Sequence, residues 1–167
     1  MSLTIRPASN SDSRYVFNLS QDPSVRQWST RTQEYSWEEH QVWWARRFNE
    51  PTTKWWMVEV DGVQCGYARY GKIVPDEFHV KEEEAAEISI AIEPRMQAQG
   101  VGRELLGTTM SLACDWLGVR RLIALVLSEN MPSHHLFRSC GFSYAGLETR
   151  MGKSHVRYEW PNPTPLR

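Results

Sequence analysis

The sequence lacks the features of a membrane protein, a nucleic-acid-binding protein or a disulfide-stabilised secreted domain. Its 167 residues hold no apolar run of the ~20 residues that a spanning helix needs. With 19 basic and 20 acidic residues, the formal net charge is −1, and no strongly basic face is indicated. Cys65, Cys114 and Cys140 are too widely spaced for a metal-ligand pair or a disulfide framework. We therefore expect a cytoplasmic protein, a monomer or homodimer, without a bound metal or a nucleic-acid or membrane partner.

The apolar patterns predict a single domain over residues 1–160, followed by a proline-rich tail over residues 161–167. We expect strands at 3–6, 54–60, 63–70, 87–92, 121–127, 142–149 and 154–160, and helices at 15–19, 36–48, 101–117 and 130–141, with a loop at 72–84. The strands and helices alternate too irregularly for a doubly wound sheet. This order predicts an α/β (α+β) domain with a mixed sheet and helices on both faces.

Residues 97–102 read Gln-Ala-Gln-Gly-Val-Gly and lie between an alternating strand and an amphipathic helix. A glycine-containing loop that enters a helix presents free N–H groups and the positive end of the helix dipole, which suit a phosphate or pyrophosphate. The spacing matches neither a dinucleotide-binding fingerprint nor a P-loop. The Q-x-x-G-x-G pattern resembles the acetyl-CoA loop of the GNAT superfamily of N-acetyltransferases. The alternative is a helix N-terminus packed close to a strand, without a ligand.

The order of elements along the whole chain also resembles the GNAT fold, a mixed sheet of about seven strands in which strands 4 and 5 splay apart. The resemblance implies that acetyl-CoA is the co-substrate and lies in that gap. There, the backbone of Ile90, Ala91 and Ile92 would hold the acetyl carbonyl, which becomes an oxyanion during transfer. The resemblance places the pyrophosphate in a cradle of loop and helix residues, namely Gln97, Gln99, Gly100, Val101, Gly102 and Arg103.

Residues 130–142, Asn-Met-Pro-Ser-His-His-Leu-Phe-Arg-Ser-Cys-Gly-Phe, resemble the N-x-x-[AS]-x-x-L-Y-x-x-x-G-F segment of the same family. The resemblance implies that Asn130 caps a helix and reaches the pantetheine of the co-substrate. The family's tyrosine, which protonates the departing thiolate in many members, is Phe137 here. A phenyl ring has no proton to give, so the thiolate leaves unassisted, receives a proton from Ser133 or water, or leaves more slowly.

Two residues are candidates for the base that accepts the proton of the attacking amine. Glu87 shares a strand face with Ser89, and the resemblance implies a carboxylate at this position in many GNAT enzymes. His40 titrates near neutrality and lies on the predicted helix over 36–48. The structural alternatives are an exposed strand carboxylate for Glu87 and a packed helix histidine for His40.

The segment over residues 19–48 resembles the N-D-P-x-V-R-x-x-S … S-x-E-E-H-x-x-W-[FW] segment of nucleotide-sugar N-acetyltransferases. These enzymes acetylate the 4-amino group of a UDP-linked deoxy-amino sugar, as in pseudaminic acid biosynthesis. The W-R-N that precedes D-P in them is Leu19-Ser20-Gln21 here. Aromatic faces can cover a sugar or stack on uracil, and an arginine can bind a diphosphate. The predicted acceptor contacts are Arg26, Trp28, Tyr35 and Trp44, with Arg69 and Tyr70 at the border of the same cleft.

Three other functions remain open at this point. The early helix is also compatible with an acetyltransferase for ribosomal proteins or protein N-termini. An antibiotic or polyamine acetylase would use the same co-substrate loop. The third function is a non-catalytic acyl-CoA-binding module, which is favoured by the presence of Phe137 where many members have the tyrosine that protonates the thiolate.

Overall fold

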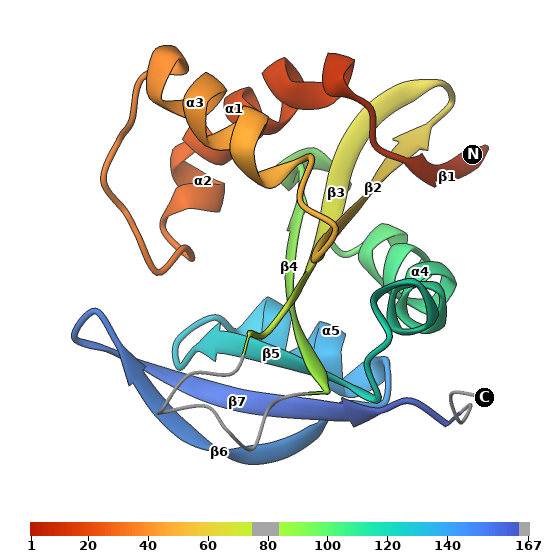
Figure 1. Cartoon of the computed structure of the whole chain (residues 1–167), viewed down its shortest axis with the longest axis vertical. Helices are drawn as coiled ribbons and strands as arrows, with labels where there is room; N and C mark the ends of the chain where they lie inside the picture. The colour runs from red at the N-terminus through yellow and green to blue at the C-terminus, as the bar shows by residue number, and fades with distance from the viewer. Residues whose placement is uncertain (75–83, 164–167) are drawn as a thin grey trace.

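The computed structural model describes residues 1–74 and 84–163, which form one seven-stranded mixed sheet flanked by helices (Figure 1). The strand order is β1-β2-β3-β4-β5-β7-β6. The strands are β1 Leu3–Pro7, β2 Thr53–Val60, β3 Val63–Lys72, β4 Ala85–Ile92, β5 Arg121–Leu127, β6 Ser143–Arg150 and β7 Lys153–Pro161. The helices are α1 Ser13–Gln21, α2 Pro23–Arg26, α3 Trp37–Arg47, α4 Val101–Leu117 and α5 Met131–Ser139, with 3-10 turns at Asn10–Asp12 and Pro94–Met96.

The predicted strands and the four predicted helices are confirmed to within a few residues at each end. The helix α2 was not predicted. Asp22 ends α1 and caps α2, because its Oδ1 accepts the N–H of Ser24 at 2.9 Å and Pro23 occupies the first helical position. Residues 75–83 of the predicted loop lie outside the described residues. Within the described ranges, no helix is long and apolar enough to cross a membrane.

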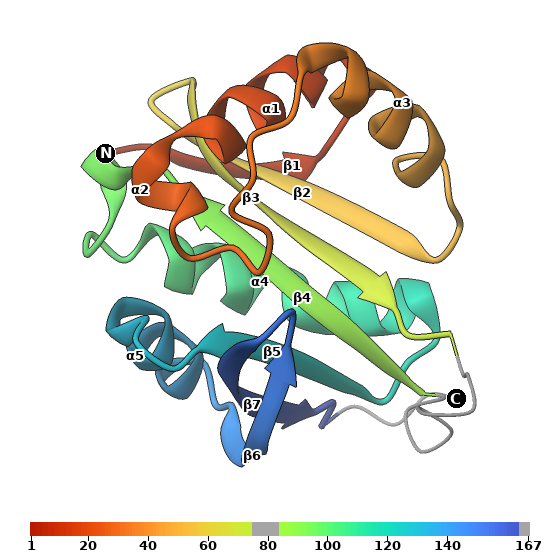
Figure 2. The same cartoon turned by 90° about the vertical axis from the view of Figure 1, so that its left-hand side faces the viewer.

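The helices cover both faces of the sheet, as Figure 2 shows, with α1 and α3 on one face and α4 on the other. Alternation along β2 sends Trp56 towards α4 and its neighbours Trp55 and Met57 towards α1 and α3. The α4 face holds the larger apolar core, in which α4 contributes fully buried residues such as Leu105 and Leu106. The α1–α3 face holds a smaller core rich in tryptophan.

Strands β4 and β5 begin side by side and then diverge, which confirms the predicted splay (Figure 2). Their parallel pairing ends at Glu87 opposite Ile123. The antiparallel pairing of β4 with β3 continues to Ile92 opposite Gly66. From Ile88 onward, the β5 side of β4 therefore has no strand partner among the described residues, and its backbone polar groups face an open gap.

Candidate active site

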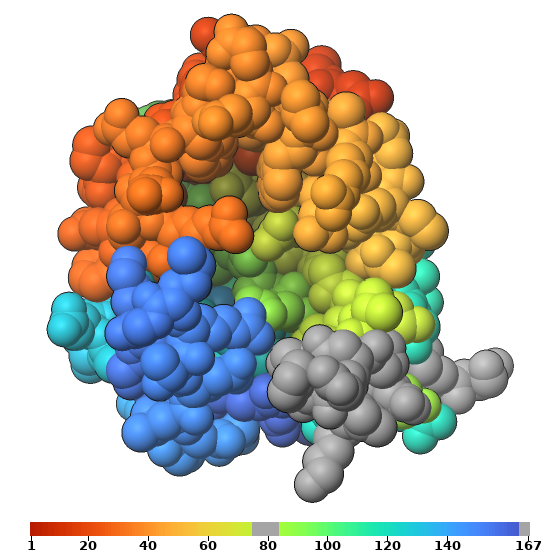
Figure 3. Space-filling model, turned by 60° about the vertical axis from the view of Figure 1, so that its left-hand side comes forward, coloured from red at the N-terminus to blue at the C-terminus, as the bar shows by residue number. Residues whose placement is uncertain are grey.

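A cavity of about 730 Å³ opens from this gap (Figure 3). The strands β3 and β4 form its floor, and residues 20–43 and the tip of the β6–β7 hairpin rise at its rim. Residues Leu125–Leu127 of β5 and three residues of the α5 segment, Asn130, Ser133 and Phe137, form the wall on the gap side. The cavity therefore joins the splay between β4 and β5 to a surface made by the α1–α3 region.

The predicted acyl-carbonyl site lies at this junction. Ile90 and Ala91 line the cavity on β4, and Ile92, at the end of the strand, is buried and does not line it. The side chain of Gln97 donates a hydrogen bond of 3.0 Å to the carbonyl of Ile92. The loop that follows β4 is thereby held against the end of the strand, and the backbone of Ile90 and Ala91 stays accessible from the gap.

The N-terminus of α4 is shaped by its glycines. Gly100 adopts a left-handed conformation with φ of 82°, which glycine accepts without strain. An added Cβ at Gly102 would lie 3.3 Å from Leu136 of α5, so the backbone is tightly packed there. Val101 is buried and anchors the first turn, where N–H groups without an intrahelical partner remain. The anion predicted from the sequence would bind to these groups.

The polar side chains of the predicted phosphate cradle lie mostly at the surface. Gln99 donates to the carbonyl of Arg95 at 2.8 Å, so both glutamine side chains bind backbone carbonyls: Gln97 at the end of β4 and Gln99 within the loop. Arg103 is exposed on the first turn of α4. None of these side chains lines the 730 Å³ cavity, so an anion at this helix terminus would occupy a neighbouring position.

The α5 segment carries a cap and an apolar wall. Asn130 is 7% exposed, and its Oδ1 accepts the N–H of Ser133 at 3.3 Å, which confirms the predicted cap of α5. Phe137 is buried against Phe142, with ring centroids 5.1 Å apart, and forms part of the cavity wall. Ser133, on the same helix as Phe137, also lines the cavity and carries a hydroxyl group.

Glu87 lines the cavity at the point where β4 and β5 part. It is half-buried, and one of its oxygens lies 3.0 Å from Nη1 of Arg150 on β6. Burial alone would lower the pKa of Arg150, but Glu87 and Glu148 together raise that pKa above its ordinary value. The structure therefore places a carboxylate beside a permanent cation where the cavity meets the β4–β5 gap.

His40 lies elsewhere. It is 1% exposed, packs between the rings of Tyr35 and Trp37, and makes a 3.0 Å hydrogen bond from its Nε2 to the hydroxyl of Ser13. Burial lowers the pKa of His40, which favours the neutral ring. The histidine does not line the cavity. The structure thus brings Glu87 to the site and places His40 between α1 and α3.

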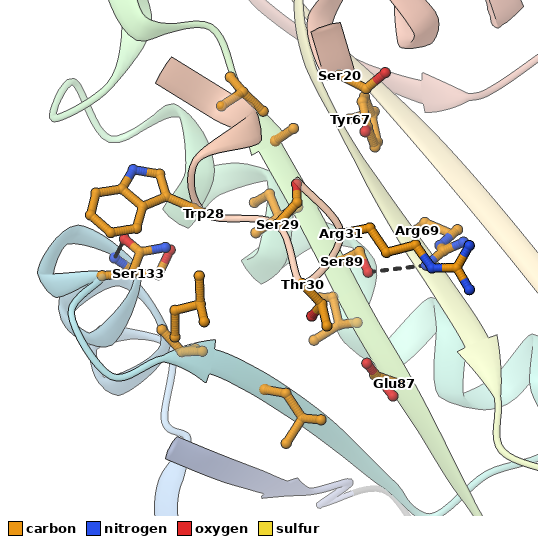
Figure 4. A pocket seen from close by; sticks show the side chains of 18 of the residues that line it. Ser20, Trp28, Ser29, Thr30, Arg31, Tyr67, Arg69, Glu87, Ser89 and Ser133 are labelled. Atoms are coloured by element: carbon orange, nitrogen blue, oxygen red, sulfur yellow. Dashed lines mark hydrogen bonds between the residues drawn. The ribbon is translucent and has the colours of Figure 1, made fainter. Parts of the chain in front are cut away.

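Three of the predicted acceptor residues, Trp28, Tyr35 and Arg69, line the cavity, and Figure 4 shows two of them, Trp28 and Arg69. Trp28 lies towards Ser133 of α5. Tyr35 closes the α1 side, where its hydroxyl lies 2.6 Å from that of Ser20. Arg69 donates a hydrogen bond of 3.3 Å to Ser89 across the β3–β4 pair.

The other three predicted acceptor residues do not reach the cavity. Arg26 is 8% exposed and is held by Gln21 and by the carbonyl of Ser20. Trp44 lies on the face of α3 that packs on the sheet and is 5% exposed. Tyr70 follows Arg69 on β3, so alternation turns it to the opposite face, where its hydroxyl bonds to that of Thr109 at 2.7 Å.

Several cavity residues were not predicted from the sequence. Among them are Trp43 on α3 and, on the sheet, Trp55, Tyr67 and Ser89, together with Glu39 at the start of α3. Strand alternation from Arg69 would have found Tyr67, which is two residues away on the same face. The choice between the adjacent Trp43 and Trp44 depends on how α3 is rotated against the sheet, and the sequence alone does not specify that rotation.

Residues 2–143 match the family model for the acetyltransferase (GNAT) domain. The spermidine N(1)-acetyltransferase of Escherichia coli strain K12 is 28% identical over 146 residues, which cover 87% of this chain and 75% of that protein. The L-amino acid N-acyltransferase MnaT of the same strain is 32% identical over 101 residues, covering 60% of this chain and 56% of that protein.

Among solved structures, the spermidine N-acetyltransferase of Vibrio cholerae, in complex with CoA and spermine, has the same fold. Its TM-score is 0.80 at 21% identity, and the match covers 96% of this chain and 95% of that one. The predicted resemblance to nucleotide-sugar enzymes finds no support in these relatives, whose names specify the acetylation of spermidine or the acylation of L-amino acids. The family model spans most of the chain, and the splayed strands and the α4 terminus have the predicted geometry. The chain therefore belongs to the GNAT family and is an N-acetyltransferase.

Proposed function

We propose that this N-acetyltransferase transfers the acetyl group of acetyl-CoA to the primary amine of a small molecule bound in the 730 Å³ cavity. The observation that carries the proposal is the continuity of that cavity from the β4–β5 gap to the wall made by α1–α3. An acyl donor in the gap and an amine at the wall would meet beside Glu87. We assign the whole activity to the single domain over residues 1–160.

The residues around the gap suit acetyl-CoA. The α4 terminus, with Gly100 in the left-handed conformation, offers backbone N–H groups to its phosphates. The edge of β4 at Ile90 and Ala91, beyond its pairing with β5, offers backbone groups to the pantetheine arm and the acetyl carbonyl. When bound, acetyl-CoA supplies a thioester that is open to attack by an amine. A backbone N–H aimed at its carbonyl would stabilise the negative charge that develops during attack.

Glu87 is the proposed base of the reaction. The amine loses one proton as its bond to the acetyl carbon forms, and Glu87 accepts that proton directly or through water. The carbon–sulfur bond breaks, and the thiolate gains a proton from Ser133 or from water, because Phe137 has none to give. Arg150, 3.0 Å from Glu87, holds the carboxylate in place at the mouth of the gap. His40 has no direct part in this scheme, because it does not line the cavity.

A small-molecule amine acceptor is favoured over a nucleotide-linked amino sugar. The relatives include enzymes named for spermidine and for L-amino acids. Arg26, the residue predicted to bind a diphosphate, is already engaged by Gln21 and Ser20. The cavity wall combines Trp28, Tyr35 and Trp43 with carboxylates, and aromatic faces attract an ammonium group.

A binding and turnover panel tests the proposal. Acetyl-CoA should raise the thermal unfolding temperature, because a ligand that binds only the native state stabilises it. Free thiol should then be released with small primary amines, among them spermidine and L-amino acids, and UDP and UDP-GlcNAc should give no stabilisation. Lack of stabilisation by acetyl-CoA would contradict the proposal. Stabilisation by UDP would restore the nucleotide-sugar acceptor, and binding without thiol release from any amine would indicate a non-catalytic module.

A further inference from the structure

Five charged side chains line the cavity: Arg31, Glu34, Glu39, Arg69 and Glu87. They differ in whether a residue of the protein pairs with their charge. Two of the carboxylates have partners: Glu87 pairs with Arg150, and Glu39 accepts the N–H of Ser36 at 2.7 Å in the capping box of α3. Arg69 forms no ion pair with any residue in the described part of the chain, and its one hydrogen bond there goes to the neutral hydroxyl of Ser89.

The surroundings of Arg69 hold its guanidinium in place. Its Cζ lies 5.7 Å from the ring centroid of Trp43 and 5.6 Å from that of Trp55, so two indoles flank the cation. Tyr67 lies two residues away on the same strand face and also lines the cavity. Burial lowers the pKa of Arg69, because the charged form has lost part of its water. A cation in such a place is stabilised by an anion that enters with the substrate.

Arg69 also stands close to the proposed base. It pairs with Ser89 in the register of β3 and β4, and Glu87 is two residues before Ser89 on the same face of β4. Two residues of a strand span about 7 Å. The cation and the carboxylate therefore face the same part of the cavity from neighbouring strands, and both can act on one small acceptor.

We propose that the acceptor is an amino acid or a similar amino carboxylic acid, and that Arg69 binds its carboxylate while its amine faces the β4–β5 gap. The planar guanidinium can bind a carboxylate through two parallel hydrogen bonds, which would orient the amine as well as bind it. A polyamine would instead bring a second ammonium group towards Arg69, where like charges repel. This inference rests on the proposed function and specifies its acceptor.

Matched pairs of acceptors test the inference directly. Each pair consists of an amino acid and the amine that lacks only its carboxylate: L-phenylalanine with 2-phenylethylamine, L-methionine with 3-(methylthio)propylamine, and L-leucine with isopentylamine. Spermidine is measured beside them, with thiol release from acetyl-CoA as the readout. In at least one pair, the intact protein should have a kcat/KM for the amino acid that is higher by about tenfold or more, or about 1.4 kcal/mol.

Substitution separates carboxylate binding from a general effect. Arg69→Gln should reduce the ratio of kcat/KM for the amino acid to kcat/KM for its carboxylate-free amine towards one. Its affinity for acetyl-CoA should stay unchanged, and calorimetry that measures this affinity also shows that the variant is folded. Ser89→Ala removes the hydroxyl that bonds Arg69 and should reduce the preference less. Arg46→Gln is the matched control, because Arg46 is exposed on α3 and does not line the cavity.

The outcomes distinguish this inference from the proposed function. Equal or better turnover of the carboxylate-free amines or of spermidine would overturn the inference and leave the proposed function intact. The same holds if Arg69→Gln slows both members of each pair equally. Absence of turnover with every amino acid tested would also overturn it. Absence of acetyl-CoA binding would overturn the proposed function itself, and it is measured without any acceptor.

Discussion

The region around β4, β5 and the start of α4 differs in kind from the region built by α1, α2 and α3, although both border one cavity. The first presents backbone: the edge of β4 beyond its pairing with β5, which ends at Glu87, and the terminus of a 17-residue helix. The second presents side chains, mainly the rings of Trp28, Tyr35 and Trp43, and the guanidinium of Arg69 lies beside them on the floor strand β3.

This difference bears on what each region can recognise. Backbone N–H groups bind phosphates and carbonyls whatever the neighbouring side chains are, so such a site can serve one invariant co-substrate. Side chains on helices and strands change the shape and charge of a wall without altering the strands below. We therefore assign the co-substrate to the β4–α4 region and the choice of acceptor to the α1–α3 region and the floor beneath it.

Replacing the adjacent Trp43 and Trp44 of α3 should give the largest effect, and it distinguishes a role in core packing from a role in acceptor binding. Trp44→Ala should lower the free energy of unfolding by about 3 kcal/mol, because it empties a site in the smaller core. Trp43→Ala should destabilise less and raise the KM of the acceptor about fivefold, or about 1 kcal/mol, through loss of the cavity wall. Chemical denaturation and steady-state kinetics measure the two effects. A reversed pattern would contradict the assignment of Trp43 to the cavity.

Replacing Glu87 tests the point where the two regions meet. Glu87→Gln should lower kcat about a hundredfold, or about 2.7 kcal/mol, because no carboxylate is left to accept the proton. Glu148→Gln is the matched control: Glu148 also pairs with Arg150, at 3.0 Å, but does not line the cavity. Equal losses in both variants would mean that the position of Arg150, and not proton transfer, is what Glu87 provides.

A change at Gly100 should affect only the co-substrate. Gly100→Val places a β-branched residue at φ of 82° beside the start of α4, and should weaken acetyl-CoA binding about tenfold, or about 1.4 kcal/mol. Gly107→Ala lies on the same helix with no atom within 4 Å of the added Cβ, and should leave binding unchanged while stabilising the helix by up to about 1 kcal/mol. Calorimetry with acetyl-CoA compares them. Unchanged affinity in Gly100→Val would count against the loop as the phosphate site.

His40 should matter for stability and little for turnover. The pKa of His40 is lowered in the folded chain, so the unfolded chain binds more protons as the pH falls, and stability should decrease below about pH 6.5. His40→Gln can keep the hydrogen bond to Ser13 and should flatten this dependence, with kcat changed less than about threefold, or about 0.7 kcal/mol.

Thermal unfolding across pH measures the flattening, and His135→Gln on the exposed side of α5 is the control that should not produce it. A loss of turnover well beyond threefold in His40→Gln would return His40 to the list of candidate bases.

Local patterns were sufficient for most of the elements and for the glycine-containing turn that enters α4. The alternation in β4, the capping box at Ser36 and the glycines around α4 act over a few residues, so their structural consequences can be read in order along the chain. The short helix α2 was missed because Asp22-Pro23 is both a helix stop and a helix start. The aromatic segment was harder to interpret, because tryptophans at helical spacing suit a core and a binding surface equally well.

The sequence by itself determined the order of the strands and of the four longer helices, the helix terminus at Gly100, and the presence of phenylalanine instead of tyrosine at position 137. Only the tertiary structure decided which tryptophan of α3 faces the cavity, that His40 is enclosed by rings, and that Glu87 meets Arg150, which is 63 residues away in the chain. The physical reason is range. Caps, turns and alternation follow from neighbouring residues, whereas the rotation of α3 and the pairing across the gap follow from how distant elements pack together.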